Sequence, residues 1–246
     1  MASVKTKQKQ FFVIEGLPRS GTTILTNIMN SFENSFCFSE PIWQLIQDPY
    51  NLKLGKLNNQ IWPNSLSPYG VVKQLKNVLE DDMYSIGGLK ETYRDWQSRC
   101  VDIVKDEDLD FRIFILRDPR YNFSGWKKTP FGPEYYDVNI FARNYLNFCD
   151  RIDMKSKLIP TYVIKYENLC KSDDPLSYLS SIIGDRISIS GDLNLTQTGY
   201  SYGDAKGNNS KSVSAPRTDT QNLTSHEINV CDELMSLYES INEGLC

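Results

Sequence analysis

The sequence of 246 residues has a single histidine and no cysteine pair in the spacing C-x-x-C. Its six cysteines therefore do not indicate a zinc or dithiol site, and reduced thiols in a cytoplasm are the simplest interpretation. No apolar run reaches the length of a membrane span, and the polar residues 1–10 enter the first strand without an apolar signal core. We expect no membrane association, and a flexible segment over residues 1–10.

The sequence also lacks an excess of positive charge, because 27 Lys and Arg face 31 Asp and Glu, for a net charge of −4. This balance does not favour nucleic acid as a partner. A hydrophobic content of 40% and 24% charged residues are typical of a globular protein. No repeat or linker divides the chain, so we expect one domain over residues 1–246.

The most informative motif that is present is the run from Gly16 to Thr23, Gly-Leu-Pro-Arg-Ser-Gly-Thr-Thr, directly after the apolar residues 11–14. It matches the phosphate-binding loop G-x-x-x-x-G-K-[ST], except that Thr22 stands at the lysine position. Backbone amides and a helix N-terminus would converge there on an anion. The missing lysine disfavours a nucleoside triphosphate, whereas Arg19 suits a phosphate or sulfuryl group.

Short apolar runs alternate with helical patterns along the chain. Strands are predicted over residues 11–14, 36–38, 111–116 and 161–166, and helices over 22–32, 42–46, 71–79, 89–104, 138–152, 175–183 and 224–241. This alternation predicts an α/β fold, a P-loop-like parallel sheet with helices on both faces. Residues 191–217 are poor in large apolar side chains and are predicted to form a loop or lid.

Four candidate residues follow predicted strands, and ligands bind at that edge of such sheets. They are Arg19, Glu40, Arg117 and Tyr166. We expect one shared site there.

A second motif, Arg112 to Arg120 continuing to Ser124, occurs after the loop. With the loop it resembles the sulfotransferases that use 3′-phosphoadenosine 5′-phosphosulfate (PAPS), and the Pro-Arg-Ser-Gly-Thr-Thr form is most similar to the tyrosylprotein and bacterial members. The resemblance implies that the loop, Pro18, Arg19, Ser20, Gly21, Thr22 and Thr23, binds the 5′-phosphosulfate. It also implies catalytic roles for Arg19 as an electrostatic stabiliser and for Glu40, 21 residues later, as the base.

The 3′-phosphate of the donor would be held by Arg117 and Ser124, although the family spaces these two residues by eight positions and this chain by seven. Tyr166 resembles a family tyrosine near the nucleotide, or else is a core residue. Residues 203–213 resemble a segment that folds over the nucleotide, where Lys211 and Ser212 would contact the phosphates. The family's G-x-W after this segment is absent.

These motifs predict sulfuryl transfer without a metal, from PAPS to a hydroxyl or amine of an unidentified small molecule, sugar or peptide. The single histidine, His226, falls near the start of a predicted surface helix, so a histidine base is not expected. A P-loop kinase-like phosphotransferase and a non-catalytic protein that binds adenosine 3′,5′-bisphosphate are the alternatives.

Overall fold

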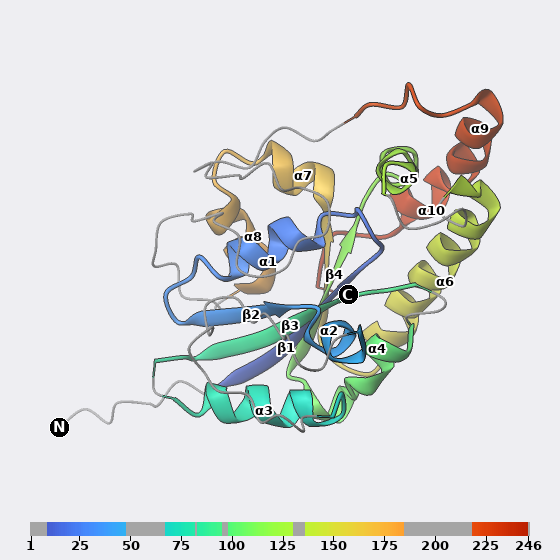
Figure 1. Cartoon of the computed structure of the whole chain (residues 1–246). Coiled ribbons are helices and arrows are strands. Elements are labelled where there is room, and N and C mark those ends of the chain that lie inside the picture. The colour runs from blue at the N-terminus through green and yellow to red at the C-terminus, as the bar shows by residue number, and fades with distance from the viewer. Residues whose placement is uncertain are drawn as a thin grey trace.

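The structure of the protein is a computed structural model, and it describes residues 9–47, 67–81, 83–94, 98–129, 136–184 and 218–245. A six-stranded sheet with the order β2-β3-β1-β4-β5-β6 forms its centre (Figure 1). The strands are β1 (Gln10–Gly16), β2 (Ser35–Ser39), β3 (Ile86–Thr92), β4 (Phe111–Leu116), β5 (Thr161–Lys165) and β6 (Gly244–Leu245). Strands β1 to β5 are parallel, and only the short β6 is antiparallel to its neighbour.

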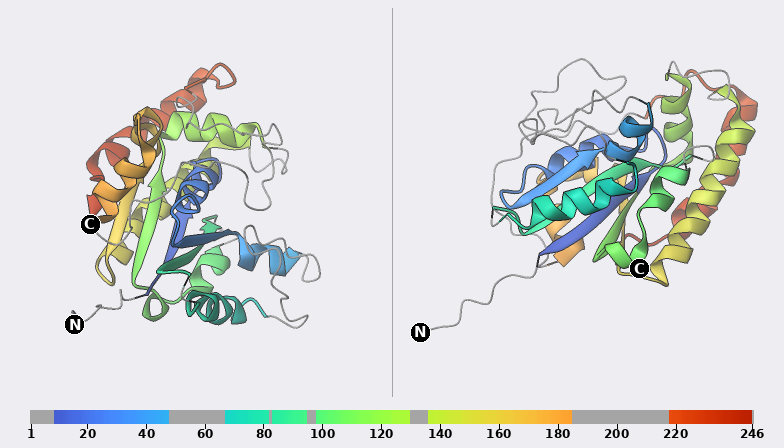
Figure 2. Two further views of the ribbon diagram at one scale, coloured as in Figure 1. Left: turned by 90° about the vertical axis from the view of Figure 1, so that its left-hand side faces the viewer. Right: turned by 60° about the horizontal axis from the view of Figure 1, so that its bottom comes forward.

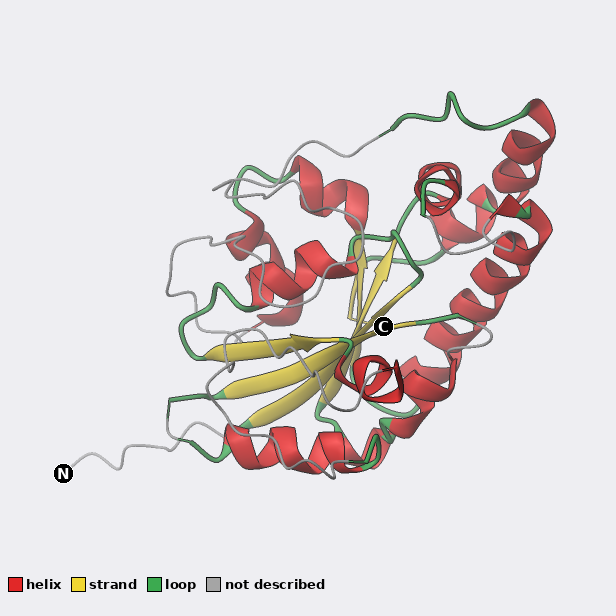
Figure 3. Cartoon of the chain, viewed as in Figure 1, coloured by secondary structure: helices red, strands yellow, loops and turns green. Residues whose placement is uncertain are grey.

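Helices cover both faces of the sheet, which confirms the predicted α/β class (Figures 2 and 3). One face packs against α1 (Thr22–Met29), α7 (Tyr166–Lys171) and α8 (Pro175–Ile183). The other face packs against α2 (Pro41–Gln47), α3 (Gly70–Leu79), α4 (Ser98–Ile103), α5 (Pro119–Lys127) and α6 (Val138–Ser156). Helix α9 (Ser225–Glu233) packs on the outside of α5 and α6. Helix α10 (Met235–Ser240) follows α9.

Strand β1 is the point at which the order of the strands reverses, because β3 lies on one side of it and β4 on the other. Alternate side chains of β1 enter opposite cores: Phe12 and Ile14 pack on the side of α1, and Phe11 and Val13 on the side of α3. The turn after β1 therefore lies between the ends of two neighbouring strands, where ligands bind in open α/β sheets.

The helix predicted over residues 89–104 is wrong. Its first part is strand β3, which lies between β2 and β1, and only α4 is helical. The strand depends on close packing at two glycines: a Cβ on Gly88 would lie 2.4 Å from the carbonyl oxygen of Phe12, and one on Gly87 would meet the ring of Phe36. The polar residues that follow these glycines, Lys90, Glu91 and Thr92, are buried at the end of the sheet.

Several element boundaries also differ from the sequence prediction. Strand β1 already begins at Gln10, which the sequence assigns to the flexible segment. Helix α1 ends at Met29 because the amide side chain of Asn30 exchanges two hydrogen bonds, both of 2.9 Å, with the backbone of Cys37. The predicted terminal helix is divided into α9 and α10 at Leu234.

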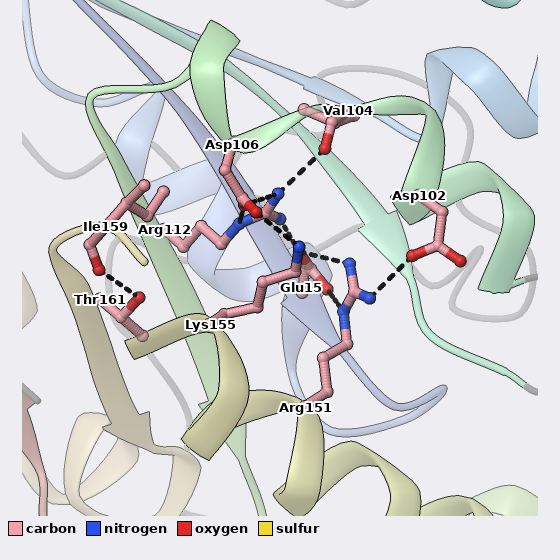
Figure 4. Close-up of polar contacts among 9 residues, drawn as sticks. All are labelled: Glu15, Asp102, Val104, Asp106, Arg112, Arg151, Lys155, Ile159 and Thr161. Atoms are coloured by element: carbon pink, nitrogen blue, oxygen red, sulfur yellow. Dashed lines mark hydrogen bonds and ion pairs between the residues drawn. The ribbon is translucent and has the colours of Figure 1, made fainter. Parts of the chain in front are cut away.

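A cluster of buried charges fastens α6 and the segment after α4 to the sheet (Figure 4). Glu15 of β1 is fully buried and accepts hydrogen bonds from two arginines, Arg112 of β4 and Arg151 of α6. Arg112 also donates to Asp106, at 2.8 Å from Nε, and Lys155 of α6 binds the second oxygen of that carboxylate at 2.7 Å. Each buried charge thus has an opposite partner, as stability requires.

Within the described ranges, no helix combines the length and the apolar character needed to cross a bilayer. The cysteines there are all free thiols and buried: Cys37, Cys100, Cys149, Cys170 and Cys231.

Candidate functional site

The loop between β1 and α1 has the backbone of an anion-binding turn. Both Arg19, with φ of 67°, and Gly21, with φ of 104°, are in the left-handed region. Gly21 is the N-cap of α1 and has no side chain to cap the first amides of the helix. Such uncapped amides and the helix dipole favour an anion. The loop is closed below by a hydrogen bond of 3.1 Å from the Ser20 amide to the Leu17 carbonyl.

The side chains of the loop fit an oxygen-rich ligand. Ser20 is buried, yet its hydroxyl is without a hydrogen-bond partner. A buried hydroxyl is costly unless it is bonded, so a ligand oxygen there would satisfy it. Thr22 is also buried, and Thr23 and Arg19 are half-buried at the surface of the loop. Pro18 is held from behind, because the Asn122 side chain donates to its carbonyl at 2.7 Å.

Arg117, directly after β4, lies against this loop. Its Nη1 donates to the carbonyl oxygen of Arg19 at 2.8 Å, and its guanidinium carbon lies 4.5 Å from the centre of the Tyr166 ring. Burial lowers the pKa of Arg117, while Tyr166 and Glu167 act in the opposite direction. Burial has the larger effect on the pKa of Arg117. An anion bound beside the guanidinium would counter this effect and stabilise its charged form.

Glu40 lies on the other side of β1, at the end of β2. Its carboxylate accepts a hydrogen bond of 2.8 Å from the Thr92 hydroxyl and forms an ion pair of 3.1 Å with Lys90 Nζ. Both partners are at the end of β3, the strand between β2 and β1. The Glu40 side chain keeps 19% of its surface exposed, so a ligand can reach it.

The partners of Glu40 favour its ionised form. Burial acts to raise the pKa of this carboxyl, but the positive charge of Lys90, the Thr92 hydroxyl and the charge of Arg94 outweigh burial and lower it. Glu40 is therefore a carboxylate at neutral pH and can accept a proton. Glu40 is thus ion-paired and at the same time accessible to a ligand.

Comparisons with known proteins bear on this arrangement. No family model matches the sequence, and no curated protein matches it either. Among solved structures, the sulfotransferase domain of the olefin synthase from Synechococcus PCC 7002 has a TM-score of 0.51 and 16% identity, over 95% of this chain and 98% of that domain. The sulfotransferase domain of the curacin biosynthetic pathway has a TM-score of 0.45 and 14% identity, over 93% and 98%.

The chain has the fold of a sulfotransferase domain. The resemblance inferred from the two motifs is confirmed at the level of the fold. At 16% identity the likeness assigns no role to any residue, so those roles depend on the geometry of this chain.

In the motif after β4, the side chain of Ser124 in α5 contacts the C-terminal segment that begins at residue 218. Its hydroxyl is buried, 2.5 Å from the carbonyl oxygen of Asp219 and 2.7 Å from Oδ1 of Asn222. The next residue is the one that faces the loop, since a Cβ on Gly125 would lie 3.2 Å from Cβ of Arg19. Binding of a 3′-phosphate by Ser124 remains a prediction that requires this C-terminal segment to move.

The structure adds three residues around Glu40 that the sequence analysis missed, and all three belong to β3. They are Lys90, Glu91 and Thr92, and each is buried beside Glu40 or its turn. The helix predicted over residues 89–104 concealed them. The sequence signal for this strand is the pair Gly87 and Gly88 before Leu89. Glycine in a strand often marks a point where another backbone or side chain approaches closely.

Some predicted features are not visible. Lys211 and Ser212 lie outside the described residues, as does the predicted lid over residues 191–217. In the part of the chain that is described, no three His, Cys, Asp or Glu side chains are grouped closely enough to hold a metal ion.

Replacing Gly21 with alanine is expected to abolish donor binding. The new Cβ would be only 2.3 Å from Cδ2 of Tyr166, in addition to the strain of a positive φ. Left-handed strain alone costs about 1–3 kcal/mol. Gly184→Ala is the matched control, because φ there is 71° and no atom lies within 4 Å of the added Cβ. Donor titration of both variants checks the prediction, and equal affinities would contradict it.

Proposed function

We propose that this protein transfers a sulfuryl group from PAPS to a hydroxyl or amine acceptor. One observation carries the proposal: the anion-binding loop after β1 lies between Arg117 on one side and the ionised Glu40, with Lys90, on the other. Neighbouring strands are about 4.8 Å apart. An anionic donor bound at the loop would thus have a base on one side and an arginine on the other.

The donor side of the reaction is electrostatic. The loop amides and the Ser20 hydroxyl would hold the 5′-phosphosulfate, with Thr22 and Thr23 at the helix start. The bond between sulfur and the bridging oxygen breaks, and the negative charge grows on the departing phosphate. Arg19 and the loop amides would stabilise this charge, and loss of one such donor typically costs about 3–4 kcal/mol. No metal is included in this proposal.

The acceptor side requires a base. The acceptor oxygen or nitrogen attacks sulfur in line with the leaving oxygen, and its proton passes to the Glu40 carboxylate. Lys90, 3.1 Å from that carboxylate, keeps it ionised. The desulfated donor thus leaves as adenosine 3′,5′-bisphosphate, and the acceptor gains the sulfuryl group in place of the proton that it gives to Glu40.

Arg117→Lys is expected to weaken donor binding by about 10- to 100-fold, since hydrogen bonds to charged groups contribute roughly 1.5–3 kcal/mol. Lysine cannot reproduce the planar fork that contacts the loop and stacks on Tyr166. The exposed Arg143→Lys on α6 is the control. The affinity for adenosine 3′,5′-bisphosphate checks this, and an unchanged affinity in Arg117→Lys would remove Arg117 from the site.

The proposed function is tested with PAPS that carries a labelled sulfuryl group and a panel of phenols, sugars, amines and peptides. Label in an acceptor supports sulfuryl transfer. Binding of PAPS and of its desulfated product without transfer to any acceptor would favour the non-catalytic alternative. Transfer of phosphate from a nucleoside triphosphate with Mg²⁺ would favour a kinase, which the threonine at position 22 disfavours.

We also propose a cytoplasmic location, with the donor and an unidentified acceptor as the partners. The free, buried thiols of the described cysteines support a reducing compartment.

A further inference from the structure

The carboxyl group of Glu91 is not used in the reaction proposed above. Its side chain is fully buried at the end of β3, next to the turn that carries Glu40. Its Oε1 accepts hydrogen bonds from the backbone amides of Ile42, at 2.7 Å, and of Trp43, at 3.4 Å. These are amides of the first turn of α2, a helix that begins one residue after Glu40. Glu91 therefore binds the segment that leaves Glu40.

The backbone at Glu40 needs such support. Its φ of 52° is in the left-handed region, which is costly for a residue with a side chain. The Glu40 amide donates to the carbonyl oxygen of Lys90 at 2.6 Å, and its carbonyl accepts from Gln44 at 2.9 Å. Strand β3 thus holds the turn at two points, by the Lys90 backbone before Pro41 and by the Glu91 side chain after it.

The surroundings of Glu91 favour its neutral form. Oε2 is buried and without a hydrogen-bond partner, so a charge there would be poorly solvated. The charged and titratable groups around it are Glu40 after β2, Lys90 on β3, Arg94 after β3 and the Cys100 thiol of α4. Burial and the charge of Glu40 raise the pKa of Glu91 to about 8, against the smaller opposite effects of Lys90 and the two amides.

We propose that Glu91 is a positioning residue, which binds the first turn of α2 and holds Glu40 in its strained conformation. This inference depends on the catalytic role proposed for Glu40. Glu91 does not touch the reacting atoms. At alkaline pH its ionisation places a second negative charge beside the Glu40 carboxylate, and the repulsion between the two carboxylates weakens the turn. Turnover of the native protein should therefore decline above a pH of about 8.

Two variants separate this role from simple core packing. Glu91→Gln keeps the size and the oxygen acceptor, so turnover at pH 7 should stay within about two-fold of the native value, and the alkaline decline should disappear. Glu91→Ala removes the acceptor, so kcat should fall by about 10- to 100-fold with little change in the KM for PAPS. A native alkaline decline in Glu91→Gln, or a native kcat in Glu91→Ala, would overturn the proposal.

Thermal unfolding gives a readout without activity. In the unfolded chain Glu91 loses its proton near pH 4.5, but in the folded protein it keeps the proton up to about pH 8. Between these two pH values Glu91 is ionised only in the unfolded state, and this lowers the stability of the native protein as the pH rises. The Tm of Glu91→Gln minus that of the native protein should thus rise from pH 5 to pH 8 and then level off. A difference independent of pH would contradict a neutral Glu91.

A crystal structure of Glu91→Ala completes the test. We expect the Glu40 turn to relax from its positive φ, and an unchanged turn would overturn the positioning role. The native protein could transfer no sulfuryl group while the thermal unfolding and the crystal structure of Glu91→Ala give the expected results. In that case the proposed function has failed, and the arrangement of Glu91 and Glu40 stands.

Discussion

Glu40→Gln is expected to lower turnover by about 10²- to 10⁴-fold, the usual contribution of a positioned base. The amide can still accept a hydrogen bond from Thr92 but cannot take the proton of the acceptor. Binding of adenosine 3′,5′-bisphosphate should stay within about two-fold, because the loop after β1 and Arg117 are untouched. Glu33→Gln, on the exposed segment before β2, is the matched control. Native turnover in Glu40→Gln would remove Glu40 from the mechanism.

The pH dependence of the native protein distinguishes Glu40 from a histidine base. Lys90 and Thr92 overcome the effect of burial and hold the pKa of Glu40 below its ordinary value, so kcat/KM should stay level through the pH range in which histidine titrates. The only histidine, His226, is exposed on α9. An unperturbed histidine base would produce an acid limb near pH 6.5. An acid limb there, still present in His226→Gln, would contradict the assignment of the proton to Glu40.

Glu15→Gln is expected to cause the largest loss of stability, about 3–5 kcal/mol, as happens when one partner of a buried ion pair is removed. Glu15 and Arg112 are both fully buried, and Arg151 approaches Glu15 Oε2 at 2.6 Å (Figure 4). Glutamine has nearly the same shape but leaves two arginines with one buried negative charge fewer. Denaturant unfolding, followed by circular dichroism, measures the change.

Asp153→Asn on the outer side of α6 is the control for Glu15→Gln. It breaks a pair with Lys157 of 2.6 Å, in which the two side chains are 70% and 68% exposed. Such surface pairs contribute about 0–1 kcal/mol. Equal losses in the two variants would mean that the buried cluster does not fasten α6 to the sheet.

Much of the fold was predictable because most elements carry a periodic apolar pattern. The predicted strand 111–116 coincides with β4, and the predicted helix 175–183 with α8. The capping box at the start of α9 was also predictable, since Thr224 and Glu227 form both of its hydrogen bonds. These elements are determined by residues close in sequence, so local reasoning is sufficient for them.

Strand β3 was not predictable in this way, and its loss also concealed part of the site. Its Lys90 and Glu91 are polar residues in a buried strand, and they are stabilised by Glu40 and by the amides of α2, which come from distant parts of the chain. The sequence pattern shows the polarity but not these partners. Functional residues often break the local rules in this manner, because the site supplies the compensation.

The Arg117–Ser124 motif shows the opposite case, in which a shift of one residue was informative. A one-residue change of spacing turns a helical side chain by about 100°. In the structure Gly125 faces Arg19, and the Ser124 hydroxyl contacts Asn222. The identity of the residue that binds the 3′-phosphate, and the contribution of Lys211 and Ser212, remain predictions.

Calorimetric titration with adenosine 3′,5′-bisphosphate tests the central claim most directly, because it measures the proposed donor site without any acceptor. We expect saturable binding to one site per chain, weaker in Arg117→Lys and absent in Gly21→Ala. Folded native protein that shows no saturable binding to this nucleotide or to PAPS would contradict the account.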